Sequence, residues 1–158
     1  MIVVADTSPI NYLILINEIG VLESLYRRVL IPHSVYAELV RSAAPEPVRK
    51  WMEFPPTWIE LRTPSSRFDA ALGRLNIGER DAILLASELH ANRLIVDDLQ
   101  GRQEAEKRGL HVTGTVGVLA EAAAVGLVGN LVDVLRRLQE TNFYIAPEIL
   151  ERVLRGPR

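Results

Sequence analysis

Short apolar runs alternate with amphipathic segments along this chain, and that alternation limits the fold more than any other feature. We expect strands at residues 2–6, 28–31, 58–61, 93–97 and 110–112. The interior strands are apolar throughout instead of switching between apolar and polar residues, which is typical of strands covered on both faces of a parallel sheet. The sequence therefore predicts the α/β class, as a three-layer α/β/α domain with a central, mainly parallel sheet.

Helices are expected between these strands and after the last of them. Thr7-Ser8-Pro9 is typical of a helix start, with a hydroxyl at the cap and proline in the first turn. A cap at Thr115 is expected in the same way. The predicted helices cover about 7–16, 20–26, 32–40, 48–52, 68–75, 78–90, 99–108, 116–125, 130–140 and 147–154. We expect one domain over 1–158, with a core at about 2–125 and a C-terminal helical extension at about 130–155.

Composition excludes several classes of protein. The 158 residues contain no cysteine, so a disulfide framework, a zinc–thiolate site and a thiol nucleophile are all ruled out. No apolar stretch approaches a membrane span, and the start of the sequence lacks the basic region of a signal peptide. We therefore expect a cytoplasmic protein with no membrane partner. Although the formal charge is −2, 16 of the 18 basic residues are arginine, which suits phosphate; genomic bias or thermal adaptation would explain this equally well.

Acidic residues gather at the places where strands are expected to give way to helices. Asp6 closes the first apolar run, and Asp97 and Asp98 close the run 93–96. In α/β proteins, ligands bind outside the carboxyl ends of parallel strands. Glu38 and the pair Glu79 and Asp81 lie on helices that could fold against this edge. Carboxylates brought together there repel by about 4 kcal/mol per close pair at an effective dielectric constant near 20, and hard cations such as Mg²⁺ and Mn²⁺ relieve that repulsion.

Each acid also has a simpler interpretation. Asp6 could cap a helix, Glu79 and Asp81 could complement a helix dipole, and Glu38 could lie on a solvated face. Other chemistries lack essential parts, because the chain has neither a glycine-rich phosphate loop nor a Gly-x-Ser-x-Gly elbow. The three histidines are isolated from one another, and we assign them no role. The combined acidic set therefore remains the strongest functional signal.

Four segments together resemble a known family. They are Asp6-Thr7-Ser8-Pro9, Pro32…Val35-Tyr36-Ala37-Glu38, Gly78-Glu79-x-Asp81-Ala82-Ile83 and Asp97-Asp98-x-x-Gly101-Arg102. Their order and spacing are similar to those of PIN-domain nucleases. The last segment, followed by Gly114-Thr115-x-Gly117-Val118-Leu119, resembles the prokaryotic branch of VapC-like toxins. The resemblance covers about residues 2–125, and the final segment from Asn142 onward is also similar to that branch.

This resemblance implies a PIN-like fold and a Mg²⁺- or Mn²⁺-dependent endoribonuclease, a hydrolase that leaves a 3′-hydroxyl and a 5′-phosphate. The family's catalytic and metal-binding quartet falls on Asp6, Glu38, Asp81 and Asp98. Glu79 competes with Asp81, and Asp97 with Asp98, as alternates or outer-shell ligands.

Two further residues are candidates for contacts with the substrate. Ser8 could hydrogen-bond a ligand carboxylate or the scissile phosphate, although helix capping is the simpler role. Arg102 could contact a phosphate, and a surface salt bridge to Glu106 is the alternative.

The implied partners are an RNA substrate, an antitoxin protein and a second copy of the chain in a homodimer. On this interpretation the chain is the toxin of a type II toxin–antitoxin pair. A housekeeping RNA-processing nuclease is the enzymatic alternative. A non-catalytic RNA- or protein-binding module, with purely structural carboxylates, is the other.

Overall fold

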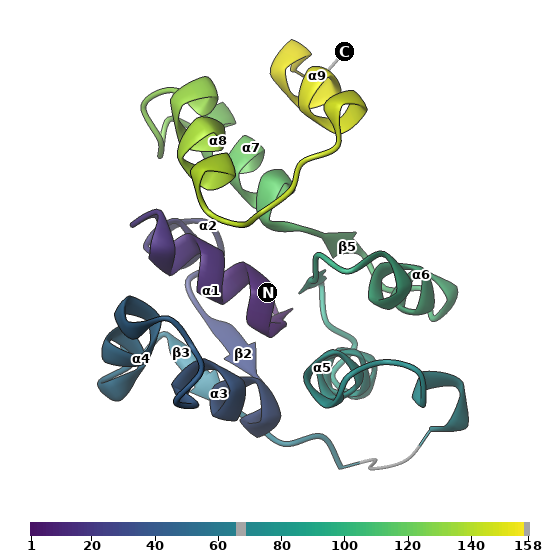
Figure 1. Cartoon of the computed structure of the whole chain (residues 1–158). Helices are drawn as coiled ribbons and strands as arrows, with labels where there is room; N and C mark the ends of the chain where they lie inside the picture. Colours follow the sequence, from purple (N-terminus) through teal and green to yellow (C-terminus); the bar gives the residue numbers. More distant parts are fainter. Residues whose placement is uncertain (66–68, 157–158) are drawn as a thin grey trace.

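The computed structural model describes residues 1–65 and 69–156, and a parallel sheet runs through its centre (Figure 1). Its strands are β1 (Val3–Ala5), β2 (Val29–Ile31), β3 (Ile59–Leu61), β4 (Arg93–Ile95) and β5 (Val112–Thr113). They lie in the order β3-β2-β1-β4-β5, and every neighbouring pair is parallel. The prediction of a mainly parallel central sheet is confirmed.

Helices cover both faces of this sheet. They are α1 (Thr7–Leu15), α2 (Val21–Tyr26), α3 (His33–Val40), α4 (Glu46–Glu53), the 3₁₀ helix η1 (Ala70–Leu72), α5 (Ile77–Glu88), α6 (Leu99–Lys107), α7 (Thr115–Ala124), α8 (Leu131–Glu140) and α9 (Pro147–Arg155). Alternate strand residues face opposite layers, as the pleat requires. Val3 and Ala5 pack with α1–α4, α7 and α8, whereas Val4 packs with α5 and α6. The expected three-layer α/β/α architecture is therefore confirmed.

The order of the strands determines where a ligand can bind. From β1 the chain moves outward to β2 and β3 on one side, then returns to place β4 on the other side of β1. The connections that follow β1 and β4 therefore leave the sheet in opposite directions, which makes the carboxyl ends of these two neighbouring strands a switch point, the usual location of a crevice in such sheets. Asp6 follows β1 directly, and its backbone N–H donates to the carbonyl of Ile95 at 2.9 Å. The sheet thus brings Asp6 next to Asp97 and Asp98.

Three local predictions were wrong. The helix expected at 68–75 is reduced to η1, and its expected start at Phe68 lies outside the described residues. A 3₁₀ turn suffices there because the Asp69 carboxylate accepts from the Ala71 N–H, a local bond that competes with a longer helix. The last strand begins two residues later and ends one residue later than expected. Thr115 begins α7 instead of capping it, and the N-cap position belongs to Gly114.

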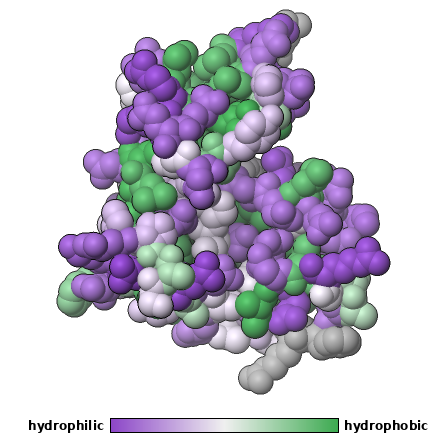
Figure 2. Space-filling model, viewed as in Figure 1, coloured by the Kyte–Doolittle hydropathy of each residue, from purple (hydrophilic) through white to green (hydrophobic). Residues whose placement is uncertain are grey.

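The C-terminal part of the chain passes back over the body of the domain. After α8 it runs between α1 and α7 in this view before forming α9 beside α7 and α8 (Figure 1). Figure 2 shows a mostly hydrophilic face with apolar side chains in separate groups, one of them at the top where α8 and α9 lie. No helix within residues 1–65 and 69–156 is long and apolar enough to cross a membrane.

Candidate active site

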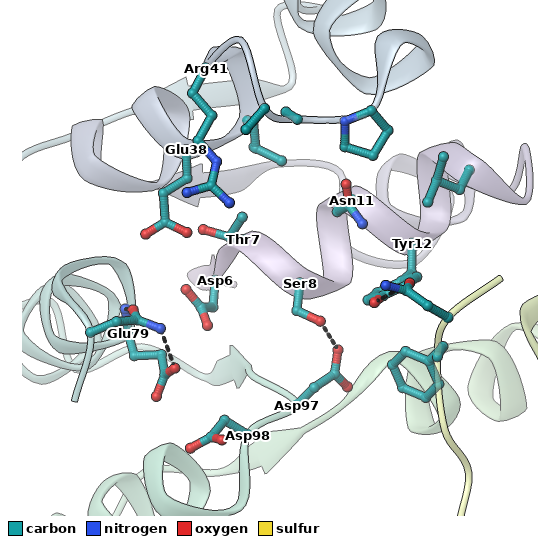
Figure 3. Close-up of a pocket in the computed structure, with 18 of the residues that line it drawn as sticks. Asp6, Thr7, Ser8, Asn11, Tyr12, Glu38, Arg41, Glu79, Asp97 and Asp98 are labelled. Carbon is teal, nitrogen blue, oxygen red and sulfur yellow. Dashed lines mark hydrogen bonds between the residues drawn. The ribbon is translucent and has the colours of Figure 1, made fainter. Parts of the chain in front are cut away.

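A cleft of about 630 Å³ opens at the carboxyl ends of β1 and β4 (Figure 3). The acidic residues that line it are Asp6, Glu38, Glu79, Asp97 and Asp98. They come from four separate parts of the chain: the end of β1, helix α3, helix α5 and the β4–α6 connection. The fold therefore brings together acids that lie up to 92 positions apart in the sequence, Asp6 and Asp98 being the most distant pair. Among the described residues, Arg41, just after α3, is the only cationic side chain that lines this cleft.

Asp6 is the most buried of these acids. Its side chain is only 5% exposed, and its Oδ1 atom has no hydrogen-bond partner. Burial raises the pKa of Asp6 from 3.8 to about 7, and the negative charges of neighbouring carboxylates add to this rise. A hydrogen bond with the backbone of Thr7 acts in the opposite direction without cancelling it. A buried acceptor without a donor is costly, so this oxygen is well suited to bind a cation.

Glu79 is held in the cleft by its own helix cap. The Asn76 side-chain oxygen accepts from the Glu79 N–H at 2.9 Å, while Asn76 Nδ2 donates to Glu79 Oε1 at 2.5 Å. This pair of bonds is a variant of the capping box and fixes the direction of the carboxylate. Burial raises the pKa of Glu79 to about 7, and the charges of Asp6 and Asp98 contribute further. Glu79 is 7% exposed, so it joins Asp6 as a buried acid.

Two glycines allow the acidic side chains to approach one another. A Cβ at Gly78 would lie 2.6 Å from Glu38 Oε1 and 3.4 Å from Asp6 Oδ1. A Cβ at Gly101 would lie 3.1 Å from Glu79 Oε2. At these two positions a larger side chain would occupy the space that the carboxylates use. The Gly-Glu and Gly-Arg dipeptides of the sequence therefore serve the geometry of the cleft.

The adjacent acids Asp97 and Asp98 have different hydrogen-bonding roles. Asp97 Oδ1 accepts from the Thr115 N–H at 2.7 Å, and its Oδ2 accepts from Thr115 Oγ1 at 2.7 Å and from Ser8 Oγ at 3.0 Å. Both oxygens of Asp97 thus join the starts of α1 and α7. Asp98 Oδ2 accepts from the Gly101 N–H at 3.1 Å as an N-cap. The Asp98 carboxylate also faces that of Glu79, and a side-chain hydrogen bond between the two contributes to the raised pKa of Glu79.

The remaining candidates from the sequence lie in other surroundings. Asp81 does not line the cleft; its Oδ2 accepts from Ser34 Oγ at 2.7 Å, which links α5 to α3. Ser8 donates to Asp97 and lies on the cleft wall. Arg102 forms no salt bridge with Glu106 in the part of the chain that the structure describes, and it lines a second, smaller hollow beside the cleft. The structure therefore brings together Asp6, Glu38, Glu79, Asp97 and Asp98, and leaves Asp81 apart.

The donor set suits a hard divalent cation. Carboxylate oxygens are the ligands that Mg²⁺ and Mn²⁺ prefer, and Asp6 Oδ1 is a buried acceptor without a donor. As the side chains stand, no three acidic or histidine residues among those described are gathered closely enough to hold one ion. Carboxylates without a counterion repel, so they are expected to stand apart.

Sequence reasoning missed several residues of this cleft. Asn76 could have been found, because Asn76-x-x-Glu79 has the spacing of a capping box. The segment around Asn142 and Phe143 could not, because it reaches the cleft only through tertiary contacts. Tyr12 Oη donates to Asn142 Oδ1 at 2.7 Å, and the rings of Tyr12 and Phe143 meet edge to face at 4.9 Å. These contacts hold the C-terminal segment at the rim of the cleft.

The fold and the cleft together define a parallel α/β/α domain with five carboxylates at the switch point of its sheet. The comparisons with known proteins agree with it. A family model described as a PIN domain (DUF3368) matches residues 2–156, so the chain belongs to the PIN-domain family. Members of this family are generally metal-dependent nucleases, which act on nucleic acids. No protein among the curated ones matches the sequence.

A solved structure shares the fold. It is a PilT N-terminus domain protein from the hyperthermophilic archaeon Sulfolobus solfataricus P2, similar with a TM-score of 0.53 and 18% sequence identity. The match covers 92% of this chain and 100% of that one. At this identity the likeness concerns the fold alone. The resemblance to PIN domains inferred from the sequence is confirmed, while the VapC-like branch stays a prediction.

Proposed function

We propose that this PIN domain is a Mg²⁺- or Mn²⁺-dependent endoribonuclease. The observation that carries the proposal is the buried Asp6, with an unpartnered oxygen and with four further acids lining the same cleft. Such a concentration of negative charge repels an RNA strand unless cations are bound. Glu79, rather than Asp81, is the better third member of the ligand set because it lines the cleft.

In this proposal each residue has a stated task. Asp6, Glu38, Glu79 and Asp98 would hold one or two ions. When bound, a divalent cation supplies an activated water and neutralises charge on the phosphodiester. Asn76 orients Glu79 through its cap, and Asp97 fixes Ser8 and the start of α7 around the cleft. No side-chain nucleophile is required, so the products would be a 3′-hydroxyl and a 5′-phosphate.

Cleavage of a mixed, structured RNA by the purified protein tests this directly. We expect cleavage with Mg²⁺ or Mn²⁺, none in EDTA, and none from Asp6→Asn or Glu79→Gln. Asp81→Asn is the matched control, since it removes one charge from the same helix outside the cleft. Activity that persists in EDTA or in Asp6→Asn would contradict the proposal. If Asp81→Asn loses cleavage activity while its stability is unchanged, Asp81 would have to be counted among the metal ligands.

We further propose that the nuclease is the toxin of a type II toxin–antitoxin pair, with an antitoxin protein and a second copy of the chain as partners. The support is the Asp97-Asp98-x-x-Gly101-Arg102 sequence, which is similar to the VapC-like branch. Induced expression of the wild type should arrest growth, and Asp6→Asn should not. Normal growth with an active wild-type enzyme would favour the housekeeping alternative. Light scattering of the purified protein measures whether it is a dimer.

A further inference from the structure

A second hollow of about 220 Å³ lies beside the acidic cleft, between the start of α7 and the segment that leads into α9. The two hollows share Asp97, Phe143 and Tyr144 in their walls. The aromatic pair is therefore the boundary between them. A ligand chain that occupies the cleft would meet this second hollow next.

Two arginines give the second hollow its charge. Arg102 on α6 and Arg152 on α9 both line it, and neither side chain has an ion pair or hydrogen bond within the described residues. The one acid in the same wall is Asp97, whose oxygens already accept from Ser8 and Thr115. Two unpaired guanidinium groups around one hollow favour an anion between them, and their planar forks suit phosphate.

The remaining walls suit a planar ring. They are formed by Val112, Val116, Ile149 and Val153, together with the two aromatic residues. Phe143 is fixed by its edge contact with Tyr12, whereas Tyr144 is 80% exposed at the boundary. An exposed aromatic ring is a stacking surface for an unpaired base. The volume is below the roughly 300–1,000 Å³ of drug-sized sites, so it fits one nucleotide and not a helix.

Binding of a nucleic acid strand in the acidic cleft also requires basic side chains close by. The chain carries a net charge of −2, and five carboxylates line the cleft itself. A nucleic acid strand gains most of its affinity from phosphate contacts with basic side chains. Among the described residues that line the cleft, Arg41 is the one cation, and the adjoining second hollow adds Arg102 and Arg152.

We propose that the second hollow is a subsite for the nucleotide next to the cleaved bond of a single-stranded RNA. Arg102 and Arg152 bind its phosphate, and Tyr144 stacks on its base. The inference rests on the proposed function, because it assumes that RNA is the substrate. It adds two details to that function: the substrate is bound on the α9 side of the cleft, and its nucleotide there is unpaired.

Binding of a short, labelled, single-stranded RNA of mixed sequence, followed by fluorescence anisotropy, tests the subsite. All variants are made in an Asp6→Asn background so that the probe is not consumed. We expect Arg102→Ala and Tyr144→Ala each to weaken binding about 5-fold or more, and Tyr144→Phe to retain it. Arg102→Ala should also make the slope of log K against log[salt] shallower by about 0.7, the value expected when one phosphate contact with a single strand is lost. Arg136→Ala, on α8 outside both hollows, removes the same charge as a control.

Cleavage assays with Asp6 intact separate the two proposals. Arg102→Ala and Tyr144→Ala should raise KM and leave kcat nearly unchanged, because the ligand set is untouched. If the wild type cleaves RNA but these variants bind and cleave like Arg136→Ala, the subsite is overturned and the nuclease stands. An acidic peptide partner in this hollow would give that same result. If the wild type neither binds nor cleaves RNA, the proposed function fails and the subsite with it.

Discussion

The buried charge of Asp6 makes the metal-free protein less stable as pH rises. A pKa of about 7 in the folded state, against an ordinary value of 3.8, means that the native protein holds this proton more tightly than the unfolded chain does. Between these two values the unfolded chain ionises while the native state stays protonated. The free energy of unfolding therefore falls with rising pH across this window, and the full loss is present above pH 7. Below pH 3.8 both states are protonated and the loss is absent.

The difference in pKa sets the size of the effect. From 3.8 to about 7 it corresponds to about 4 kcal/mol for Asp6. Glu79 acts in the same direction, since its pKa is also raised to about 7. Because a domain of this size is stable by about 5–15 kcal/mol, a change of this magnitude is readily measured. A bound divalent cation should reverse the loss at pH 8, where the carboxylates are ionised, and do little at pH 5.

Urea unfolding in EDTA between pH 5 and pH 8 measures this effect, with the fluorescence of Trp51 and Trp58 as the signal. We expect wild-type stability to fall by about 3 kcal/mol more than that of Asp6→Asn over this range, because only the part of the window between pH 5 and about 7 is sampled. Comparison with the variant cancels the titration of the groups that do not interact with Asp6; Glu79 is the exception, because the charge of Asp6 contributes to its raised pKa. Asp6→Asn should be the more stable protein at pH 8 without metal. Equal pH dependence in the two proteins, or a wild type that gains stability toward pH 8, would refute the argument.

Three further predictions concern the walls of the cleft. Glu79→Gln should lower metal-dependent cleavage by about 100-fold or more, since even outer-shell changes cost about 10–100-fold. Asp81→Asn should stay within about threefold of wild-type cleavage and close to wild-type stability, because the amide oxygen can still accept from Ser34 Oγ. Gly78→Ala should weaken Mn²⁺ binding in calorimetry while the fold is kept, because the new Cβ displaces the flexible end of Glu38; unchanged Mn²⁺ affinity would contradict this. Asp97→Ala should lower the free energy of unfolding by about 2–3 kcal/mol, measured with urea, because it leaves the start of α7 without its acceptor; a loss below about 1 kcal/mol would disprove that role.

The fold could be predicted from the sequence because its interior strands are uniformly apolar. Runs such as Val29-Leu30-Ile31 are buried on both faces, and only a parallel sheet between two helical layers buries them so. The helix expected at 68–75 failed because its apolar pattern is short and Asp69 offers the backbone a local alternative. Pattern reasoning is weakest for such short segments, where one side-chain hydrogen bond decides the outcome.

The choice between Glu79 and Asp81 shows what the sequence leaves open in the site. Residues two apart on a helix point in different directions, so only the rotation of α5 about its axis decides which of them faces the cleft. That rotation follows from the apolar residues of α5, which pack beneath the sheet, and from Asn76, which caps the helix. The second hollow was beyond prediction, because Arg152 and Tyr144 reach it only through the path of the C-terminal segment.

The two raised pKa values and the position of the cleft have a common origin. A parallel sheet places the carboxyl ends of β1 and β4 side by side, so the residues that follow these strands must share one small space. When those residues are acids, burial and mutual repulsion both oppose their ionisation. The same arrangement that destabilises the metal-free protein therefore supplies affinity for a cation, since ion binding removes the repulsion at the position where a phosphodiester must be cleaved. In every variant of this cleft, the free energy of unfolding that the metal-free protein loses at Asp6 and the affinity that Asp6 provides for a cation should consequently change together.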